Sequence, residues 1–376
     1  MRLGAALVLV LVGCEAAPVG NEGACGDDAV HQVGTVTLSG ADADAQAEAL
    51  CDSADSVDEL VVSGTSWTDL SAVDCLCGVG SLTLESNPDL VSTEPVRVVA
   101  GEVEGVRVVG SPLLDDLAAY AQVTGFSDLH LQTLGLGSLS GLGAATRLDV
   151  LTLVDMPALA SLDDLAEEVQ VGSLVIQSAA DLEAVGDWSA PRSIEALTVS
   201  GTAIETLAGL ADADSLTQLV LVSNPSLSDL TGYPRATVSP LALSIGDSAA
   251  LSSLSPLRGV TQLDSLALSG LADSATLAGL EDLAMVGGVS LAGFPHLQDL
   301  AGLGGLRYLT STGLHLEVHD EGPDLTDLSA LHELQGVAGG ITITGPVSDG
   351  ACLALWEHVA DLMDPNEFQC GAFAPE

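Results

Sequence analysis

Two histidines and a glutamate near the C-terminal end of the chain form the set that most resembles a metal site. His315, Glu317 and His319 stand at positions i, i+2 and i+4, so an extended strand would project all three on one side. Imidazole and carboxylate groups together suit zinc and other transition metals. The two histidines would lie about 13 to 14 Å apart along a strand, however, which is too far to share one ion unless the chain bends. We therefore expect exposed polar side chains here and no metal.

Catalytic chemistry has little support in the sequence. The chain contains no G-x-S-x-G elbow, H-E-x-x-H helix, P-loop or dinucleotide fingerprint. A serine nucleophile needs a base and an orienting partner in contact with it, and the seven histidines are dispersed along the chain. We expect a protein that is not an enzyme and needs no cofactor, with a hydrolase as a minor alternative.

The elements that would position any site recur as short apolar-x-apolar triplets, spaced 22 to 27 residues apart. Their alternation predicts a short strand whose outer residues point into a core and whose middle residue points out. Between the triplets, further leucines and turns rich in Gly, Pro and Asn predict a second wall and its corners. The triplets occupy residues 36–38, 60–62, 82–84, 106–108, 129–131, 151–153, 174–176, 197–199, 219–221, 243–245, 266–268, 289–291, 314–316 and 341–343.

One coil resembles a leucine-rich repeat of the short kind, closest to the receptor L-domain repeats of bacterial surface lipoproteins. It reads Leu216-x-x-Leu219-x-Leu221-x-x-Asn224-Pro225-x-Leu227-x-x-Leu230. The resemblance implies a mainly β fold, a right-handed parallel β solenoid of about 14 coils over residues 33–350, and a binding or scaffold role. The turn asparagine of that family recurs only at Asn87 and Asn224, with Thr202 and Ser248 as expected substitutes. Elsewhere the position is apolar, as at Met156, Leu271 and Phe294.

The middle residues of the triplets would line the face that binds a partner. From the third coil onward most are small and neutral, and apart from Arg107 they lack the Tyr, Trp and Arg anchors that carry most binding energy at interfaces. We expect weak or avid contact with a protein or polysaccharide partner. Two tryptophans outside the strands are expected either to pack at the rim or to be exposed contacts. The candidate binding residues are Arg107, His130, Thr152, Thr198, His315, Trp67 and Trp188.

The N-terminus carries a signal of export. Arg2 precedes the apolar run Leu3 to Val12, which is typical of a signal peptide and too short for a permanent membrane span. The sequence Leu-Val-Gly-Cys ending at Cys14 resembles a bacterial lipobox. The resemblance implies cleavage after residue 13, a lipid on Cys14, and a place in the bacterial cell envelope, with the outer membrane or cell surface favoured over the inner membrane. A plain secretory signal with an incidental cysteine is the alternative.

The expected organisation follows from these signals. Residues 1–13 form the signal peptide, 14–32 the lipidated cysteine with a linker and N-terminal cap, 33–350 the solenoid, and 351–376 a C-terminal cap with a helix over Leu353–Met363. Trp356 in that helix is expected to cover the end of the stack, whose last coil would otherwise lack a neighbour.

The six other cysteines suggest disulfides, as is usual in exported proteins. Cys51 and Cys75 each follow their strand triplet by thirteen residues, so they are expected on neighbouring coils at bridging distance. The remaining expected pairs are Cys25 with Cys77 and Cys352 with Cys370. A zinc site at Cys75 and Cys77 would need a second close pair of ligands, which is not evident.

Charge excludes one class of partner. The chain has 53 acidic residues against 8 basic ones and a net charge of −45, which repels nucleic acid and anionic headgroups. We interpret the acids as a solvated exterior. The alternative is a divalent-cation-binding acidic envelope protein with calcium as its ion, although only fragments of a calcium loop occur, at residues 42–44 and 212–214.

Overall fold

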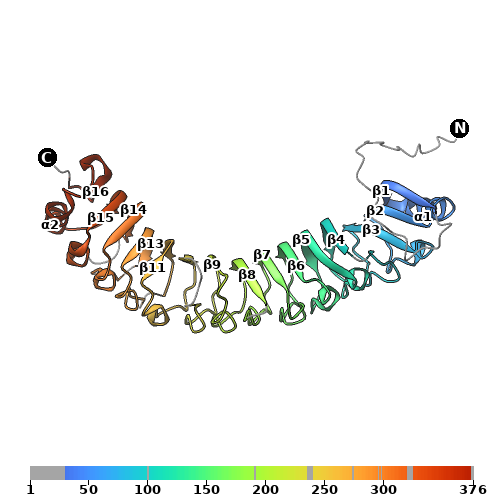
Figure 1. The fold of residues 1–376 in the computed structure, drawn as a ribbon, viewed down its shortest axis with the longest axis horizontal. Helices are drawn as coiled ribbons and strands as arrows, with labels where there is room; N and C mark the ends of the chain where they lie inside the picture. Colours follow the sequence, from blue (N-terminus) through green and yellow to red (C-terminus); the bar gives the residue numbers. More distant parts are fainter. Residues whose placement is uncertain are drawn as a thin grey trace.

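The computed structural model describes residues 30–99, 101–189, 192–234, 240–272, 275–294, 296–297, 299–319 and 325–373. The chain forms an arc of stacked coils, with the strands along its inner, concave side and turns along its outer, convex side (Figure 1). The first strand lies at one tip and the last at the other.

A single 16-stranded sheet runs the length of the arc, and its strands pair with their sequence neighbours in parallel. The predicted mainly β solenoid is therefore confirmed. Strand β11 lies off the main path and pairs with β13. The strands are β1 His31–Ser39, β2 Ser56–Ser63, β3 Gly78–Glu85, β4 Gly101–Ser111, β5 Val123–Leu134, β6 Arg147–Val154, β7 Gln170–Gln177, β8 Ser193–Ser200, β9 Gln218–Val222, β10 Ala242–Gly246, β11 Gln262–Leu263, β12 Ser265–Ser269, β13 Met285–Phe294, β14 Tyr308–Val318, β15 Gly336–Thr344 and β16 Phe368–Cys370.

The triplets fall in register from coil to coil. Leu174 pairs with Leu151 on one side and with Leu197 on the other, and the same alignment holds along the sheet. The outer residues of the triplets, except the half-buried Val36, are buried in one continuous core. Because each coil buries its leucines only against its neighbours, the stack as a whole supplies the core that one coil lacks.

Short helical turns form the convex wall. Their buried residues, such as Leu142 and Leu303, pack against the back of the sheet. The α-helices are α1 Ala43–Cys51 and α2 Asp349–Val359, and the 3-10 turns are η1 Gly40–Asp42, η2 Ser71–Val73, η3 Ala118–Tyr120, η4 Ser140–Leu142, η5 Ser255–Leu257, η6 Ala301–Leu303, η7 Ser329–Glu333 and η8 Pro365–Glu367.

The C-terminal cap differs from the prediction in two ways. Helix α2 begins at Asp349 and ends at Val359, four residues earlier at each end than the helix predicted over Leu353–Met363. It begins earlier because the Ser348 hydroxyl accepts a hydrogen bond from the backbone N–H of Ala351, as an N-cap. The chain after α2 then returns as β16, which pairs with β15 and adds a rung that the triplet pattern had not included.

The corner after each strand has a repeated backbone form. The residue two positions beyond the triplet is in the left-handed region in most coils, as at Gly201 (φ 64°) and Thr133 (φ 55°). Glycine adopts this region freely, whereas a β-branched threonine is strained there.

The described helices are too short or too polar to traverse a lipid bilayer.

Candidate binding face

Three outward columns of side chains run along the concave face. The middle column is the one expected from the triplets. Strand pairing places Arg107 beside His130 and His130 beside Thr152. The same pairing continues from Thr198, one strand at a time, to His315. One column flanks it on each side, two residues away along each strand. The sequence prediction did not include these flanking columns, although the same alternation of the strand places them on this face.

The centre of this surface, from β6 to β13, carries no charged side chain in the three columns, and we call it the neutral face. Hydroxyl, amide, alanine and valine side chains alternate across it, and most are half-buried. Charged residues are 16% of the chain, so their absence here is a feature of this surface. The neutral face comprises Thr152, Val175, Thr198, Val220, Ser244, Ala267 and Ser290, flanked by Val150, Ser173, Ala196, Gln218, Ala242 and Ser265 on one side and by Val154, Gln177, Ser200, Val222, Gly246, Ser269 and Ala292 on the other.

Polar pairs bound the neutral face at its N-terminal end. The Arg107 guanidinium lies 3.5 Å from a carboxylate oxygen of Glu85 on the neighbouring strand. His130, one rung further, is hydrogen-bonded through Nε2 to the amide oxygen of Gln132 at 3.1 Å. Both candidate residues are therefore held by neighbours on the face itself.

The His315 cluster bounds the other end. His315 and Glu317 are exposed on β14, and the exposed His319 follows the last residue of that strand. Within the ranges that the structure describes, no group of three His, Cys, Asp or Glu side chains is placed to hold a metal ion. The three residues thus lie along the surface and do not converge.

The two tryptophan candidates do not lie on the concave face. Trp188 is 2% exposed, and its indole N–H donates to the Val185 carbonyl at 2.7 Å, so the suggestion that it is an exposed contact is wrong. It fills the core at a turn whose sequence departs from the regular leucine pattern. Trp67 is half-buried against the core, and its indole N–H donates to Asp44 at 2.7 Å. Rim packing is the correct description of Trp67.

One Ser-His-Asp contact occurs at the N-terminal edge, which the dispersed histidines had not suggested. His31 Nδ1 lies 2.8 Å from Ser56 Oγ, and His31 Nε2 lies 2.7 Å from Asp58 Oδ1. A serine nucleophile must be reached by its substrate, but Ser56 is only 2% exposed. The contact ties β1 to β2, because His31 is on the first strand and both partners are on the second.

Many Asp, Ser and Thr side chains of the convex wall cap the turns. A side-chain oxygen accepts a hydrogen bond from the backbone N–H two residues later, which satisfies a donor at the start of each turn. Hydrogen bonds from Ser71 lower the pKa of Asp69, and those from Ser189 lower the pKa of Asp187. The residues that accept in this way are Asp69, Ser92, Asp116, Ser138, Ser161, Asp187, Thr206, Asp229, Ser253, Thr276, Asp299, Asp327 and Asp364.

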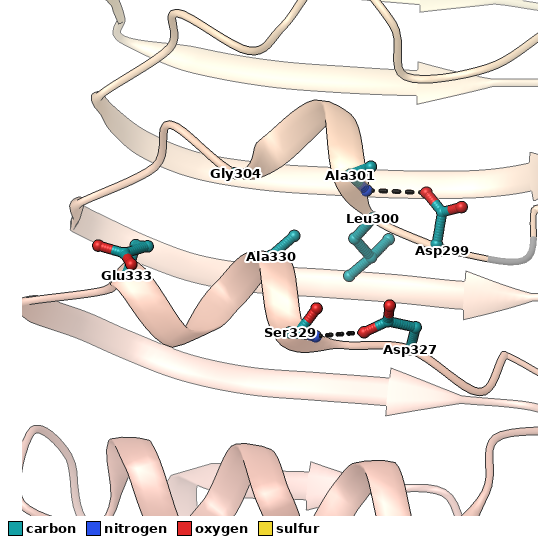
Figure 2. A pocket seen from close by; sticks show the side chains of 8 residues that line it. All are labelled: Asp299, Leu300, Ala301, Gly304, Asp327, Ser329, Ala330 and Glu333. Carbon is teal, nitrogen blue, oxygen red and sulfur yellow. Dashed lines mark hydrogen bonds between the residues drawn. The ribbon is translucent and has the colours of Figure 1, made fainter.

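A cavity of about 260 Å³ opens between two of these turns. Asp299 and Asp327 stand in neighbouring coils, and Figure 2 shows each carboxylate bonded to the N–H at the start of its own turn, Ala301 at 2.9 Å and Ser329 at 2.8 Å. Glu333 on the other side of the cavity is 3.6 Å from Arg307. The carboxylates around this space are engaged by the fold and do not point together at a ligand.

Two of the expected disulfides are present and lie near the two tips. Cys51 is bonded to Cys75, and Cys352 to Cys370, each pair with Cα atoms 5.7 Å apart. Cys77 is also disulfide-bonded. Its expected partner Cys25 lies outside the described residues, as does Cys14, the expected lipid attachment site.

No protein-family model matches the chain, and the search of curated proteins gives no match. Among solved structures, a leucine-rich-repeat protein from Leptospira interrogans is similar over 87% of this chain and 92% of its own, with 14% identity and a TM-score of 0.39. The solenoid fold described above follows from the strand pairing of this chain alone.

Proposed function

We propose that the protein is a lipid-anchored component of a bacterial cell envelope that acts without chemistry of its own, as a recognition, adhesion or scaffold module. The neutral face is the surface through which it binds its partner. Repeat arrays of this kind present extended concave surfaces for binding.

The observation that carries the proposal is the distribution of charge. A net charge of −45 favours solubility and discourages non-specific association with anionic surfaces. A surface of the same chain without charge is spared that repulsion. It is also spared the cost of desolvating carboxylates when a partner covers it. The neutral face is thus well suited to close contact with a partner.

The partner we propose is an uncharged stretch of protein or polysaccharide that extends along the arc. Ser, Thr and Gln side chains of the neutral face offer hydrogen bonds, and the valines between them offer small apolar contacts. Since the face lacks large aromatic anchors, each rung would contribute little. Affinity would come from the sum over many rungs.

Site-specific photo-crosslinking in the producing cells tests this proposal. Benzoylphenylalanine replaces Thr198 or Val220 on the neutral face and, as a matched control, the exposed residue Glu183 outside the sheet. We expect discrete adducts from the first two positions and none from Glu183. Adducts from Glu183 alone, or none from any position, would contradict the assignment of the neutral face.

The proposed anchor has its own test. Cys14→Ala removes the thiol to which a lipid would be attached, so the variant should be released from the membrane fraction. Protease added to intact and to permeabilised cells then reports which side of the envelope holds the solenoid. Cleavage on intact cells supports a role at the cell surface, whereas protection until permeabilisation limits the search to partners inside the envelope.

A further inference from the structure

Two imidazole rings meet where the last coil contacts the cap helix. His332 of η7 and His358 of α2 are stacked, with ring centroids 5.4 Å apart and planes 24° from parallel. His358 Nε2 donates to the Leu334 carbonyl at 3.2 Å. His332 Nε2 is buried and has no hydrogen-bond partner among the described residues. Stacked rings do not aim their nitrogens at a common point, so the arrangement is unsuited to sharing a metal ion.

We propose that this His332–His358 pair is a proton-operated latch, which holds the C-terminal turn of α2 against the last coil at neutral pH and releases it on acidification. Histidine is the side chain that changes charge most readily between about pH 5 and 8. Two neutral rings stack favourably, whereas two imidazolium ions at this separation repel each other. The repulsion acts between α2 and the coil that it covers.

The charged groups around the pair do not cancel this repulsion. Asp327 interacts electrostatically with His332. Because both residues belong to the coil that α2 covers, this interaction does not hold α2 to the coil. The Glu333 carboxylate forms an ion pair with Arg307 at 3.6 Å. On the helix side, Glu357 and Asp361 are exposed and belong to α2 and its extension. Each of these acids belongs to one side of the contact, so the interactions named here do not join α2 to the coil that it covers.

The Cys352–Cys370 disulfide would limit the release to the C-terminal end of α2, which would move as a hinge. Cys352, in the first half of α2, is bonded to Cys370 of β16, which remains paired with β15. His358 lies in the last turn of the same helix. Acidification would thus free the end of α2 that carries His358 while its first half stays tethered. Release would uncover the apolar surface that Leu355 and Val359 now cover.

Hydrogen exchange of the full chain at pH 7.5 and pH 5.0 tests the latch. After correction for intrinsic exchange, amides in the last turn of α2 should exchange several-fold faster at pH 5.0, because two like charges repel across the contact while solvent at the exposed His358 screens part of the repulsion. The double variant His332→Phe/His358→Phe keeps stacked rings without titration and should lose this response. His130→Phe, on the concave face, should keep it.

Two outcomes would overturn the latch. One is a wild-type protein whose α2 amides exchange equally at both pH values after correction. The other is an acid response that persists in the double variant, since general protonation of the acidic surface would then be its cause. If the double variant does not fold, His358→Gln retains a side-chain donor for the Leu334 carbonyl without the charge, and it should lose the response in the same way.

Discussion

Asn224 accepts two hydrogen bonds from Thr202 on the preceding coil: Oδ1 lies 3.2 Å from the backbone nitrogen of Thr202 and 2.8 Å from its hydroxyl. The Asn224 amide also donates to the Val199 carbonyl at 2.9 Å. Asn87 makes the same three bonds with Thr65 and Val62. The two asparagines that resemble the family's turn residue thus each join one coil to the next.

Asn224→Ala should lower the free energy of unfolding by about 1 to 3 kcal/mol, because it leaves buried backbone groups of the preceding coil unpaired. Urea denaturation followed by circular dichroism measures the change. Asn366→Ala is the matched control, since Asn366 is exposed and bonded to Asp364 within its own turn. Equal effects at the two sites would contradict the argument.

Thr133→Gly should raise the free energy of unfolding by about 1 kcal/mol, because glycine adopts the left-handed conformation without the penalty of a β-branched side chain. Thr133 is exposed, at φ 55°. The control is Thr124→Gly on the same strand, where φ is not positive and glycine should destabilise. A stabilisation at both positions, or at neither, would exclude strain at Thr133.

Acid should weaken the convex turns. Hydrogen bonds from Ser71 hold the pKa of Asp69 below its usual value. A carboxyl with a folded pKa below its unfolded value of about 3.9 stabilises the fold above that value and loses this contribution as pH falls through the folded pKa. Asp69→Asn keeps an acceptor without titration, so its stability should fall less steeply than that of wild type between about pH 4 and 2.

Urea midpoints at a series of pH values measure this difference. Asp181→Asn is the control, because Asp181 is exposed and is not among the residues that cap a turn. Its profile should run parallel to wild type. A parallel profile for Asp69→Asn as well would show that the capping bond does not discriminate between the two protonation states.

Ser56 should not react as a nucleophile despite its contact with His31. At 2% exposure it is shielded from a substrate, so a fluorophosphonate probe should leave it unlabelled. Ser56→Ala should instead destabilise the chain by about 1 kcal/mol through the lost hydrogen bond. Labelling that disappears in both Ser56→Ala and His31→Ala would contradict this and support a hydrolase.

The solenoid could be predicted from sequence because one pattern, apolar-x-apolar, recurs in every coil and fixes both the strand and the direction of its side chains. Phe368-Gln369-Cys370 follows the same pattern but comes after a helix, so the interruption hid it. The burial of Trp188 could not be predicted, because a position in a turn gives no sign of burial. The bond between its indole N–H and Val185 satisfies the one polar atom that would otherwise oppose burial.

The candidate site was only partly predictable. The middle column of the concave face follows directly from the triplets, whereas the neutral face emerges only when the register aligns its flanking columns. The His31–Ser56 and His332–His358 contacts join residues 25 and 26 positions apart. One coil separates the members of each pair, but no local pattern distinguishes a contacting pair from others at the same spacing.

The Cys51–Cys75 and Cys352–Cys370 bonds lie near the two tips of the arc, and this placement bears on how the chain could come apart. A terminal coil of a linear stack has one neighbour, whereas an internal coil has two, so stacks of this kind fray from their ends. Disulfides at the tips oppose fraying where the fewest contacts between coils must break. Cys51–Cys75 joins the first coil to the second, and Cys352–Cys370 joins α2 to β16 within the cap. Each tip must therefore detach as a cross-linked unit, so the folded chain should open slowly and resist proteolysis.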